Sequence, residues 1–222
     1  MKCAIFDMDG TLINSEKKYF ACWQNLMQHE GYDLTTDFYR TVLGSPINEI
    51  KPLFLKEYGS AFPFDALLEQ VLQVRENYVN NAHFELNCGT AEFLQACRQA
   101  EITCGLATSS SQTEAQLILE ALDIWDYFDF TAFGSEVLKG KPDPEIFHLA
   151  AARSGHPKSD IIVFEDSTNG VLSASAAGLK VYHLNDFIPI AEEIEILPLA
   201  SYQDFTEIMT ACQNHPALLT TI

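Results

Sequence analysis

The sequence predicts an α/β fold in which a parallel sheet lies between two layers of helices and carries an inserted helical domain. Two patterns indicate this fold. Short apolar runs alternate with helical patterns over most of the chain, and one long helical stretch interrupts them. The length of 222 residues agrees with a domain that has an inserted partner, since a single domain has roughly 150 residues. A content of 47% hydrophobic residues excludes disorder and fibrous repeats.

Four apolar, partly β-branched runs predict the strands. They span residues 3–6, 102–107, 161–164 and 179–182. A strand that is covered on both faces shows a continuous apolar run rather than an alternation of apolar and polar residues. We therefore expect these runs to be buried, parallel strands.

Helical patterns separate the strands. The pattern at 113–122 follows Ser111, which begins an S-x-x-E capping box. A second helix is expected from the capping residue Asp143 to Gly155, and a third, rich in small residues, at about 169–177. Alternating strands and helices of this kind form βαβ units and a parallel sheet.

Residues 15–87 interrupt this alternation, because their apolar residues follow a helical period without an intervening strand. We therefore expect residues 1–14 and 88–222 to form a Rossmann-like three-layer core, and residues 15–87 to form an inserted helical cap domain. A further helix is expected around residues 204–212 of the tail.

The charge of the chain excludes several classes of partner. The formal net charge is −18, from 31 acidic and 13 basic residues. Binding to nucleic acid or to an anionic membrane relies on attraction to positive charge, whereas this negatively charged chain would be repelled, so we expect neither partner.

The six cysteines lack C-x-x-C and zinc-ligand spacing, and the N-terminus lacks the pattern of a signal peptide. We expect free, buried thiols, a cytoplasmic location and a monomer.

Two carboxylates, Asp7 and Asp9, follow the first predicted strand. Ligands of open α/β sheets bind at the carboxyl ends of the strands, and strand alternation places these two side chains on one side of the chain. They repel each other unless a proton or a divalent cation such as Mg²⁺ lies between them. A plain Asp-Gly turn is the alternative. A calcium loop is excluded, because Thr11 and Leu12 replace residues that it requires.

Two hydroxyl groups follow the second predicted strand, and a lysine lies in a loop further along the chain. Thr108 and Ser109 precede the capped helix, where hydroxyls and free N–H groups can bind a phosphate or can simply cap the helix. Lys141 lies in a loop between Gly140 and Pro142. In a chain with few cations it is a candidate for neutralising a bound anion, although an ordinary surface lysine is the alternative.

A second acidic pair, Glu165 and Asp166, follows the third predicted strand. Helix capping explains the hydroxyls of Ser167 and Thr168 after this pair, but it does not explain two adjacent carboxylates behind a buried strand. Metal ligation explains both observations. The acidic pairs, the hydroxyls and the lysine therefore all lie at strand carboxyl ends around one expected crevice.

This combination resembles the haloacid dehalogenase-like (HAD) phosphohydrolase superfamily over essentially the whole chain. The resemblance rests on the D-x-D-G-T motif at 7–11, the hydroxyl of Thr108, the Lys-Pro pair at 141–142 and the Glu-Asp-Ser motif at 165–167. Together with the helical insertion, these motifs are most similar to the subgroup that contains β-phosphoglucomutase and small sugar-phosphate phosphatases.

The resemblance implies a role for each motif. Asp7 would be the nucleophile that forms an aspartyl-phosphate, and Asp9 would be the general acid and later the general base. Asp7, the backbone carbonyl of Asp9 and Asp166 would hold Mg²⁺, with Glu165 beside them or just outside the ligands.

The remaining implied roles concern the phosphate and the rest of the substrate. Phosphate would be bound by Thr108, Ser109 and Lys141. The turn chemistry of the loop at residues 44–49, between two cap helices, leads to the hypothesis that this loop overhangs the site and selects the substrate, with Ser45, Asn48 and Glu49 as the selecting residues.

The sequence thus predicts a Mg²⁺-dependent phosphatase that hydrolyses a small phosphomonoester, expected to be a sugar phosphate. Asp9 excludes the dehalogenases and phosphonatases of the superfamily. A phosphosugar mutase is the alternative, weakened because Tyr19 and Ile47 stand where β-phosphoglucomutase has a histidine and an arginine. A regulatory module that binds phosphate without catalysis is a third hypothesis, and the complete set of motifs argues against it.

Overall fold

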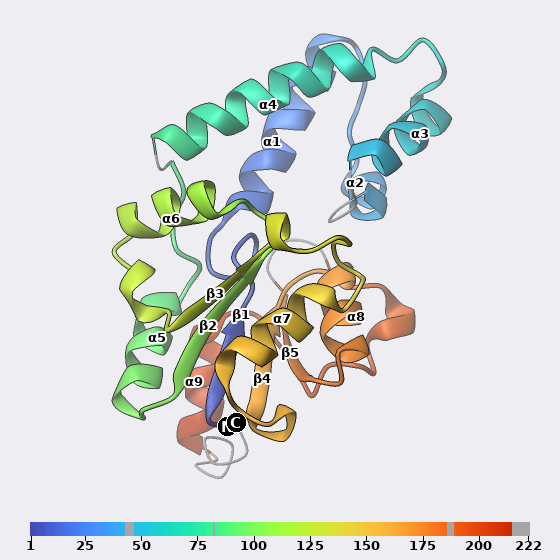
Figure 1. Cartoon of the computed structure of the whole chain (residues 1–222). Coiled ribbons are helices and arrows are strands. Elements are labelled where there is room, and N and C mark those ends of the chain that lie inside the picture. The colour runs from blue at the N-terminus through green and yellow to red at the C-terminus, as the bar shows by residue number, and fades with distance from the viewer. Residues whose placement is uncertain (43–46, 82, 186–188, 215–222) are drawn as a thin grey trace.

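The computed structural model describes residues 1–42, 47–81, 83–185 and 189–214, and only the backbone at 47–49 and 214 (Figure 1). Within these residues the sheet has six parallel strands in the order β3-β2-β1-β4-β5-β6. The strands are β1 (Cys3–Phe6), β2 (Thr103–Thr108), β3 (Phe130–Phe133), β4 (Ile161–Glu165), β5 (Lys180–Leu184) and β6 (Ser201–Tyr202). The predicted α/β fold is confirmed.

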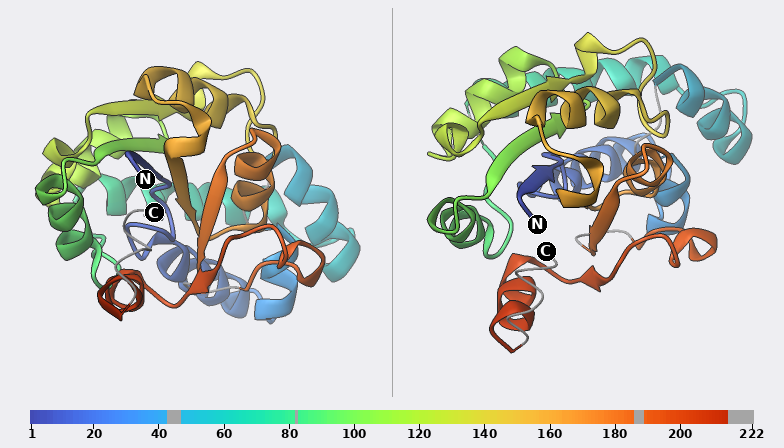
Figure 2. Two further views of the ribbon diagram at one scale, coloured as in Figure 1. Left: turned by 90° about the horizontal axis from the view of Figure 1, so that it is seen from below. Right: turned by 60° about the horizontal axis from the view of Figure 1, so that its bottom comes forward.

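Helices cover both faces of the sheet (Figures 1 and 2). One face packs against α5 (Thr90–Gln99), α6 (Gln112–Ala121) and α9 (Phe205–Asn214), and the other against α7 (Glu145–Ser154) and α8 (Thr168–Ala176). Short 3₁₀ helices lie at Trp125–Tyr127, Gly134–Glu136, Lys158–Asp160 and Glu192–Ile194.

Strand β1 shows why the predicted strands are apolar throughout. Ala4 and Phe6 point into the core on one face, while Cys3 and Ile5 point into the core on the other. All four residues are fully buried. A central parallel strand covered on both sides has no solvent face on which to place polar residues.

The helix ends follow the predicted signals closely. Glu114 N–H donates to Ser111 Oγ at 3.3 Å, and Ser111 N–H donates to the Glu114 carboxylate at 3.2 Å, which confirms the capping box of α6. Asp143 Oδ1 accepts a hydrogen bond from Glu145 N–H at 3.1 Å, and α7 begins at Glu145, two residues after the expected capping residue Asp143. Gly155 ends α7 with a positive φ of 68°.

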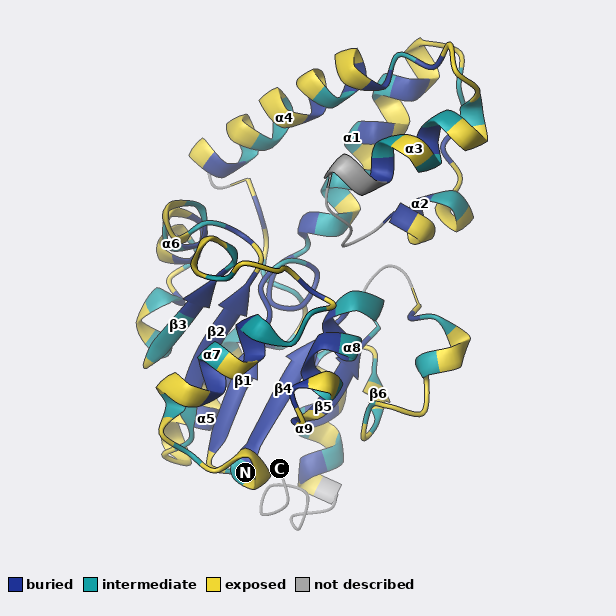
Figure 3. Cartoon of the chain, turned by 45° about the vertical axis from the view of Figure 1, so that its right-hand side comes forward, coloured by how far each residue is buried: buried dark blue, intermediate teal, exposed yellow. Residues whose placement is uncertain are grey.

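Between β1 and α5, the described residues form four helices, which stand at the carboxyl end of the strands (Figures 1 and 3). They are α1 (Ser15–His29), α2 (Thr36–Val42), α3 (Ile47–Tyr58) and α4 (Phe64–Asn80). Their core is aromatic, with the Trp23 ring stacked 5.1 Å from Phe54 and 6.0 Å from Phe64. The helical character expected from the periodicity of this region is present in the structure.

Two chain segments connect this helical group to the sheet, and they lie side by side. Asn14 N–H donates to the Glu85 carbonyl at 3.0 Å, and the Asn14 amide donates to the Glu85 carboxylate at 2.9 Å. Asn87 N–H donates to the Leu12 carbonyl at 2.9 Å. The two connections therefore meet close to the positions at which we expect the domain boundaries.

The apolar-run pattern did not identify strands β3 and β6. β3 contains only Phe130–Phe133 and lies at one edge of the sheet, and β6 has two residues at the other edge. Edge strands are half covered, so they lack the continuous apolar signal of the central strands.

All six cysteines are free, as expected, although Cys88 is exposed and Cys22 half-buried. Among the described residues no helix has the length and apolarity needed to span a membrane.

Candidate active site

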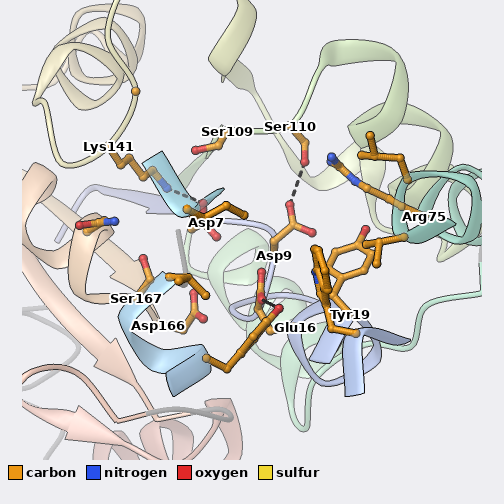
Figure 4. A pocket seen from close by; sticks show the side chains of 18 of the residues that line it. Asp7, Asp9, Glu16, Tyr19, Arg75, Ser109, Ser110, Lys141, Asp166 and Ser167 are labelled. Atoms are coloured by element: carbon orange, nitrogen blue, oxygen red, sulfur yellow. Dashed lines mark hydrogen bonds and ion pairs between the residues drawn. The ribbon is translucent and has the colours of Figure 1, made fainter. Parts of the chain in front are cut away.

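A cavity of about 470 Å³ lies between the carboxyl ends of the strands and the helical group above them (Figure 4). β1, β2 and β4 run side by side in register, so the residues that follow them converge at one edge of the sheet. Six of the residues expected in the site line this cavity: Asp7, Asp9, Ser109, Lys141, Glu165 and Asp166. The structure therefore brings together residues from four separate parts of the sequence.

Lys141 lies among the buried acidic groups. Its Nζ donates to Asp7 Oδ1 at 2.5 Å, to Glu165 Oε1 at 2.8 Å and to the Ala107 carbonyl at 3.3 Å. Burial alone would lower the pKa of the Lys141 ammonium, but Asp7 and Glu165 raise it above its ordinary value. Lys141 therefore stays charged and balances part of the negative charge of the site.

The carboxylates of Asp7, Glu165 and Asp166 form a compact, buried group that could hold a metal ion, because their oxygens lie within 4.8 Å of one another. Burial raises the pKa of Asp7 and of Asp166 well above the ordinary value, and the neighbouring carboxylates raise both further. A hard divalent cation such as Mg²⁺ prefers oxygen ligands and would relieve this repulsion. The residues present thus fit the expected metal.

Glu165 and Asp166 are fixed by different contacts. Glu165 Oε2 accepts hydrogen bonds from Ser167 N–H at 2.7 Å and from the Ser167 hydroxyl at 3.1 Å, while its other oxygen accepts from Lys141. Asp166 Oδ1 accepts from the buried Thr11 hydroxyl at 3.0 Å. Both oxygens of Glu165 therefore have protein partners, which suits a residue beside the metal ligands.

Two glycines give these carboxylates room. Gly10 has a positive φ of 79°, and a Cβ at this position would overlap the Asp166 carboxylate. A Cβ at Gly170 on α8 would overlap the Glu165 carboxylate in the same way. Side chains at either position would displace the acidic group from the edge of the sheet.

Asp9 lies apart from the three buried carboxylates and is half-buried. Its Oδ2 accepts a hydrogen bond from the Ser110 hydroxyl at 2.8 Å, and Figure 4 shows the pair beside Asp7. This placement leaves the Asp9 carboxyl free of the metal group and within the cavity. The expectation that its backbone carbonyl binds the metal stays a prediction.

Thr108 and Ser109 take different positions. Ser109 is exposed and lines the cavity. Thr108 is fully buried and is absent from the lining, and its hydroxyl accepts a hydrogen bond from Ser110 N–H at 3.0 Å. In this arrangement Thr108 shapes the loop that presents Ser109 and Ser110, and its contact with phosphate stays a prediction.

The cap loop expected to select the substrate falls largely outside the described residues. Ser45 is not described, and Asn48 and Glu49 lie in the first turn of α3 without described side chains. The side chain of Ile47 is likewise not described, whereas the Tyr19 side chain lines the cavity. The selection role of the three loop residues stays a prediction.

The sequence did not single out several residues that the structure places at the site. Ser110 binds Asp9, and Arg75 from α4 lines the cavity together with Glu16 from α1. His183 on β5 lies 3.1 Å from the Asp166 carbonyl through Nε2; because a carbonyl only accepts, Nε2 carries the hydrogen. Arg75 is the single basic residue of α4, which is the signal that could have identified it.

The fold and the site define a class of protein: a three-layer α/β protein with a buried acidic group that can hold a metal ion, a lysine paired with that group, and helices above the cavity. The chain belongs to the haloacid dehalogenase-like hydrolase family, whose model matches residues 4–184. The expected family is thereby confirmed.

Relatives with printed names agree with this membership. A phosphorylated carbohydrates phosphatase of Thermotoga maritima is 34% identical over 191 residues, covering 84% of this chain and 88% of the relative. A probable pseudouridine-5'-phosphatase of Drosophila melanogaster is 30% identical, covering 82% and 80%. The crystal structure of a putative β-phosphoglucomutase from Thermotoga maritima is 29% identical, with a TM-score of 0.74 over 97% of this chain and 100% of that one. The expected enzyme class, a phosphoric monoester hydrolase of the HAD-like family, is confirmed.

Proposed function

We propose that this protein is a Mg²⁺-dependent phosphatase that hydrolyses a small phosphomonoester, a sugar phosphate, through an aspartyl-phosphate on Asp7. The observation that carries the proposal is the position of Asp7 at the carboxyl end of β1, bound to the Lys141 ammonium at 2.5 Å and facing the cavity. The relative named as a phosphatase of phosphorylated carbohydrates supports the substrate class. Phosphoryl transfer requires mainly positioning and charge neutralisation, which this arrangement provides.

Asp7 and Asp9 have different roles in the reaction, the first as nucleophile and the second as general acid and base. A carboxylate oxygen of Asp7 attacks phosphorus in line, and the bond from phosphorus to the ester oxygen breaks. The Asp9 carboxyl gives its proton to the departing alkoxide, and the Ser110 hydrogen bond of 2.8 Å holds Asp9 in place. Asp9 then accepts a proton from water, which attacks the phosphoryl group, releases phosphate and restores the Asp7 carboxylate.

Other residues hold the phosphate and the metal. Asp7, Asp166 and the Asp9 carbonyl would bind Mg²⁺, which supplies positive charge to the phosphoryl oxygens when bound. Glu165 keeps Lys141 in position through its 2.8 Å contact. Lys141 and Ser109 would contact the phosphate, with Thr108 supporting the loop at Ser109.

The domain organisation serves this site. We assign residues 1–14 and 88–222 to the catalytic core and residues 15–87 to the cap. The cap lies over a cavity of about 470 Å³, a volume within the range of binding sites for small molecules. Cap residues, including Ser45, Asn48 and Glu49, would contact the alcohol portion of the substrate and select it.

The experiment that tests this function is the release of inorganic phosphate from a panel of sugar and nucleoside monophosphates. We expect release with Mg²⁺, and a loss of about 100-fold or more in chelator, because the metal neutralises charge in the transition state. Each reaction is also analysed for isomeric sugar phosphates. An isomer formed without free phosphate would contradict hydrolysis and indicate a mutase. Inactivity over the whole panel would favour the regulatory module.

Metal binding is expected to stabilise the protein more as the pH rises. Burial raises the pKa of Asp7 and Asp166 above 3.8, so without metal the folded protein retains protons that the unfolded chain releases. The stability of the metal-free protein therefore falls as the pH rises above that value, whereas metal binding requires ionised carboxylates. The increase in melting temperature on adding Mg²⁺ should be larger at about pH 8 than at about pH 5. An equal increase at both pH values would contradict this account.

A further inference from the structure

Arg75 provides positive charge on the cap side of the cavity. Among the described residues that line the cavity, Lys141 and Arg75 are the two lysine or arginine side chains. The Lys141 ammonium is occupied by Asp7 and Glu165 on the sheet side. Arg75 is therefore the cation available to the part of a substrate that extends toward the cap.

The contacts of the Arg75 guanidinium leave hydrogen-bonding capacity. Its Nη2 lies 3.4 Å from Glu114 Oε1, and its carbon Cζ lies 5.8 Å from the centre of the Tyr19 ring. Its Nε is buried and has no hydrogen-bond partner among the described residues. A ligand in the cavity cannot reach this buried nitrogen, but 34% of the Arg75 side chain is exposed, so the other guanidinium nitrogens can meet an acceptor on a bound ligand.

The position of Arg75 identifies which part of the substrate it meets. Figure 4 shows Arg75 and Tyr19 on the Asp9 side of the site, with Lys141 and Asp166 on the other side of Asp7. In the proposed mechanism Asp9 protonates the leaving oxygen. Arg75 and Tyr19 therefore face the alcohol that leaves, rather than the phosphoryl group.

The charges around Arg75 indicate the chemistry of that alcohol. Burial alone would lower the pKa of the guanidinium. Tyr19, followed by Glu114 and Asp9, raises this pKa above its ordinary value, so Arg75 stays charged. Glu114 pairs with Arg75 from outside the cavity lining, and a second anion in the substrate would meet repulsion from Asp9 and Glu16, which line the cavity. A hydroxyl group suits the site better, because it can accept from Arg75 and donate to a carboxylate.

An apolar surface lies next to these polar groups. Leu68, Val71 and Leu72 of α4 line the cavity beside Arg75, and Trp23 of α1 lines it as well. Carbon–hydrogen faces of a sugar or polyol pack on such a surface while their hydroxyls reach the polar groups. The cap side thus combines one cation, one phenol and an apolar wall.

We propose that Arg75, together with Tyr19, forms the binding site for the leaving group and selects an uncharged, polyhydroxylated alcohol over one that carries a second negative charge. This inference rests on the proposed phosphatase function. Arg75 acts here as a specificity-determining residue, whereas Asp7, Asp9 and Lys141 act on the phosphoryl group.

The test compares kcat/KM for glucitol 6-phosphate and for p-nitrophenyl phosphate, which has no hydroxyls on its leaving group. In Arg75→Met the ratio of the two values should fall by about 10- to 100-fold, the effect of losing a charged hydrogen bond. Arg75→Lys keeps the charge without the planar fork, so its ratio should lie between those of Arg75→Met and wild type. A ratio equal to that of wild type in both variants would overturn the proposal. Thermal unfolding of each variant verifies that it is folded.

Glu114→Gln is the matched control. Glutamine can keep the capping box of α6, while the charge opposite Arg75 is removed. The substrate ratio of Glu114→Gln should stay within about 2-fold of wild type, since a part-exposed ion pair contributes little. If Glu114→Gln reproduces the ratio of Arg75→Met, then Arg75 acts through the contact between cap and core, and the proposal fails.

A second pair of substrates tests the charge preference. Wild type should hydrolyse glucitol 6-phosphate about 10-fold or more efficiently than gluconate 6-phosphate, which adds one carboxylate. A preference for gluconate 6-phosphate would overturn the proposal. Failure of the wild type on all of these substrates would instead refute the proposed function, so the two failures are distinguishable.

Discussion

Replacing the carboxylate of Asp7 by an amide, in Asp7→Asn, should reduce kcat by about 10⁴-fold or more, because a carboxamide is a poor nucleophile for phosphorus. The variant should fold normally, since the amide oxygen can still accept the hydrogen bond that Asp7 Oδ1 accepts from Lys141. Phosphate release under saturating substrate and Mg²⁺ measures the loss.

Asp7→Ala is the control for this variant. Asparagine can deamidate slowly to aspartate and restore a trace of activity, whereas alanine cannot. Activity that grows with storage in Asp7→Asn and stays absent in Asp7→Ala would be assigned to deamidation. Normal turnover in either fresh variant would refute the nucleophilic role of Asp7.

Lys141→Met should destabilise the protein by about 3–5 kcal/mol without metal, because it leaves two buried carboxylates without their cation. The Lys141 side chain is only 6% exposed, and its ammonium contacts both Asp7 and Glu165. Added Mg²⁺ should reduce the loss, since the metal supplies positive charge to the same acidic group. Urea unfolding with and without Mg²⁺ measures both effects.

Lys139→Met is the matched control for Lys141→Met. Its side chain is 75% exposed, and its ammonium lies 3.6 Å from Asp143. An exposed pair of this kind contributes about 0–1 kcal/mol, so Lys139→Met should have little effect. Equal losses in the two variants would contradict the stabilising role that we assign to Lys141.

Sequence reasoning was most successful where local patterns determine the structure. The apolar run of β1 and the capping box at Ser111 depend on neighbouring residues, and both match the structure. The close approach of Asp7 and Asp166 could be predicted from one general rule, that the carboxyl ends of parallel strands lie at the same edge of a sheet.

The partners of the site residues could not be predicted in the same way. Ser110 reaches Asp9 across 101 positions of sequence, and Arg75 reaches the cavity from a helix that otherwise shows an ordinary amphipathic pattern. His183 lies on a buried strand, where its contact with the Asp166 carbonyl depends on the pairing of β4 with β5. Such contacts arise from tertiary packing, and only Arg75, as the single basic residue of α4, leaves a trace of its role in the local sequence.

The most direct test of the central claim is to locate the phosphoryl group during turnover. Wild-type protein is mixed with Mg²⁺ and the best sugar phosphate of the panel, quenched rapidly in acid and analysed by peptide mass spectrometry. The account predicts one added phosphoryl group on the peptide that contains Asp7, and none in Asp7→Ala. A phosphoryl group on another residue, or steady turnover with no phosphorylated peptide under conditions that preserve acyl phosphates, would contradict it.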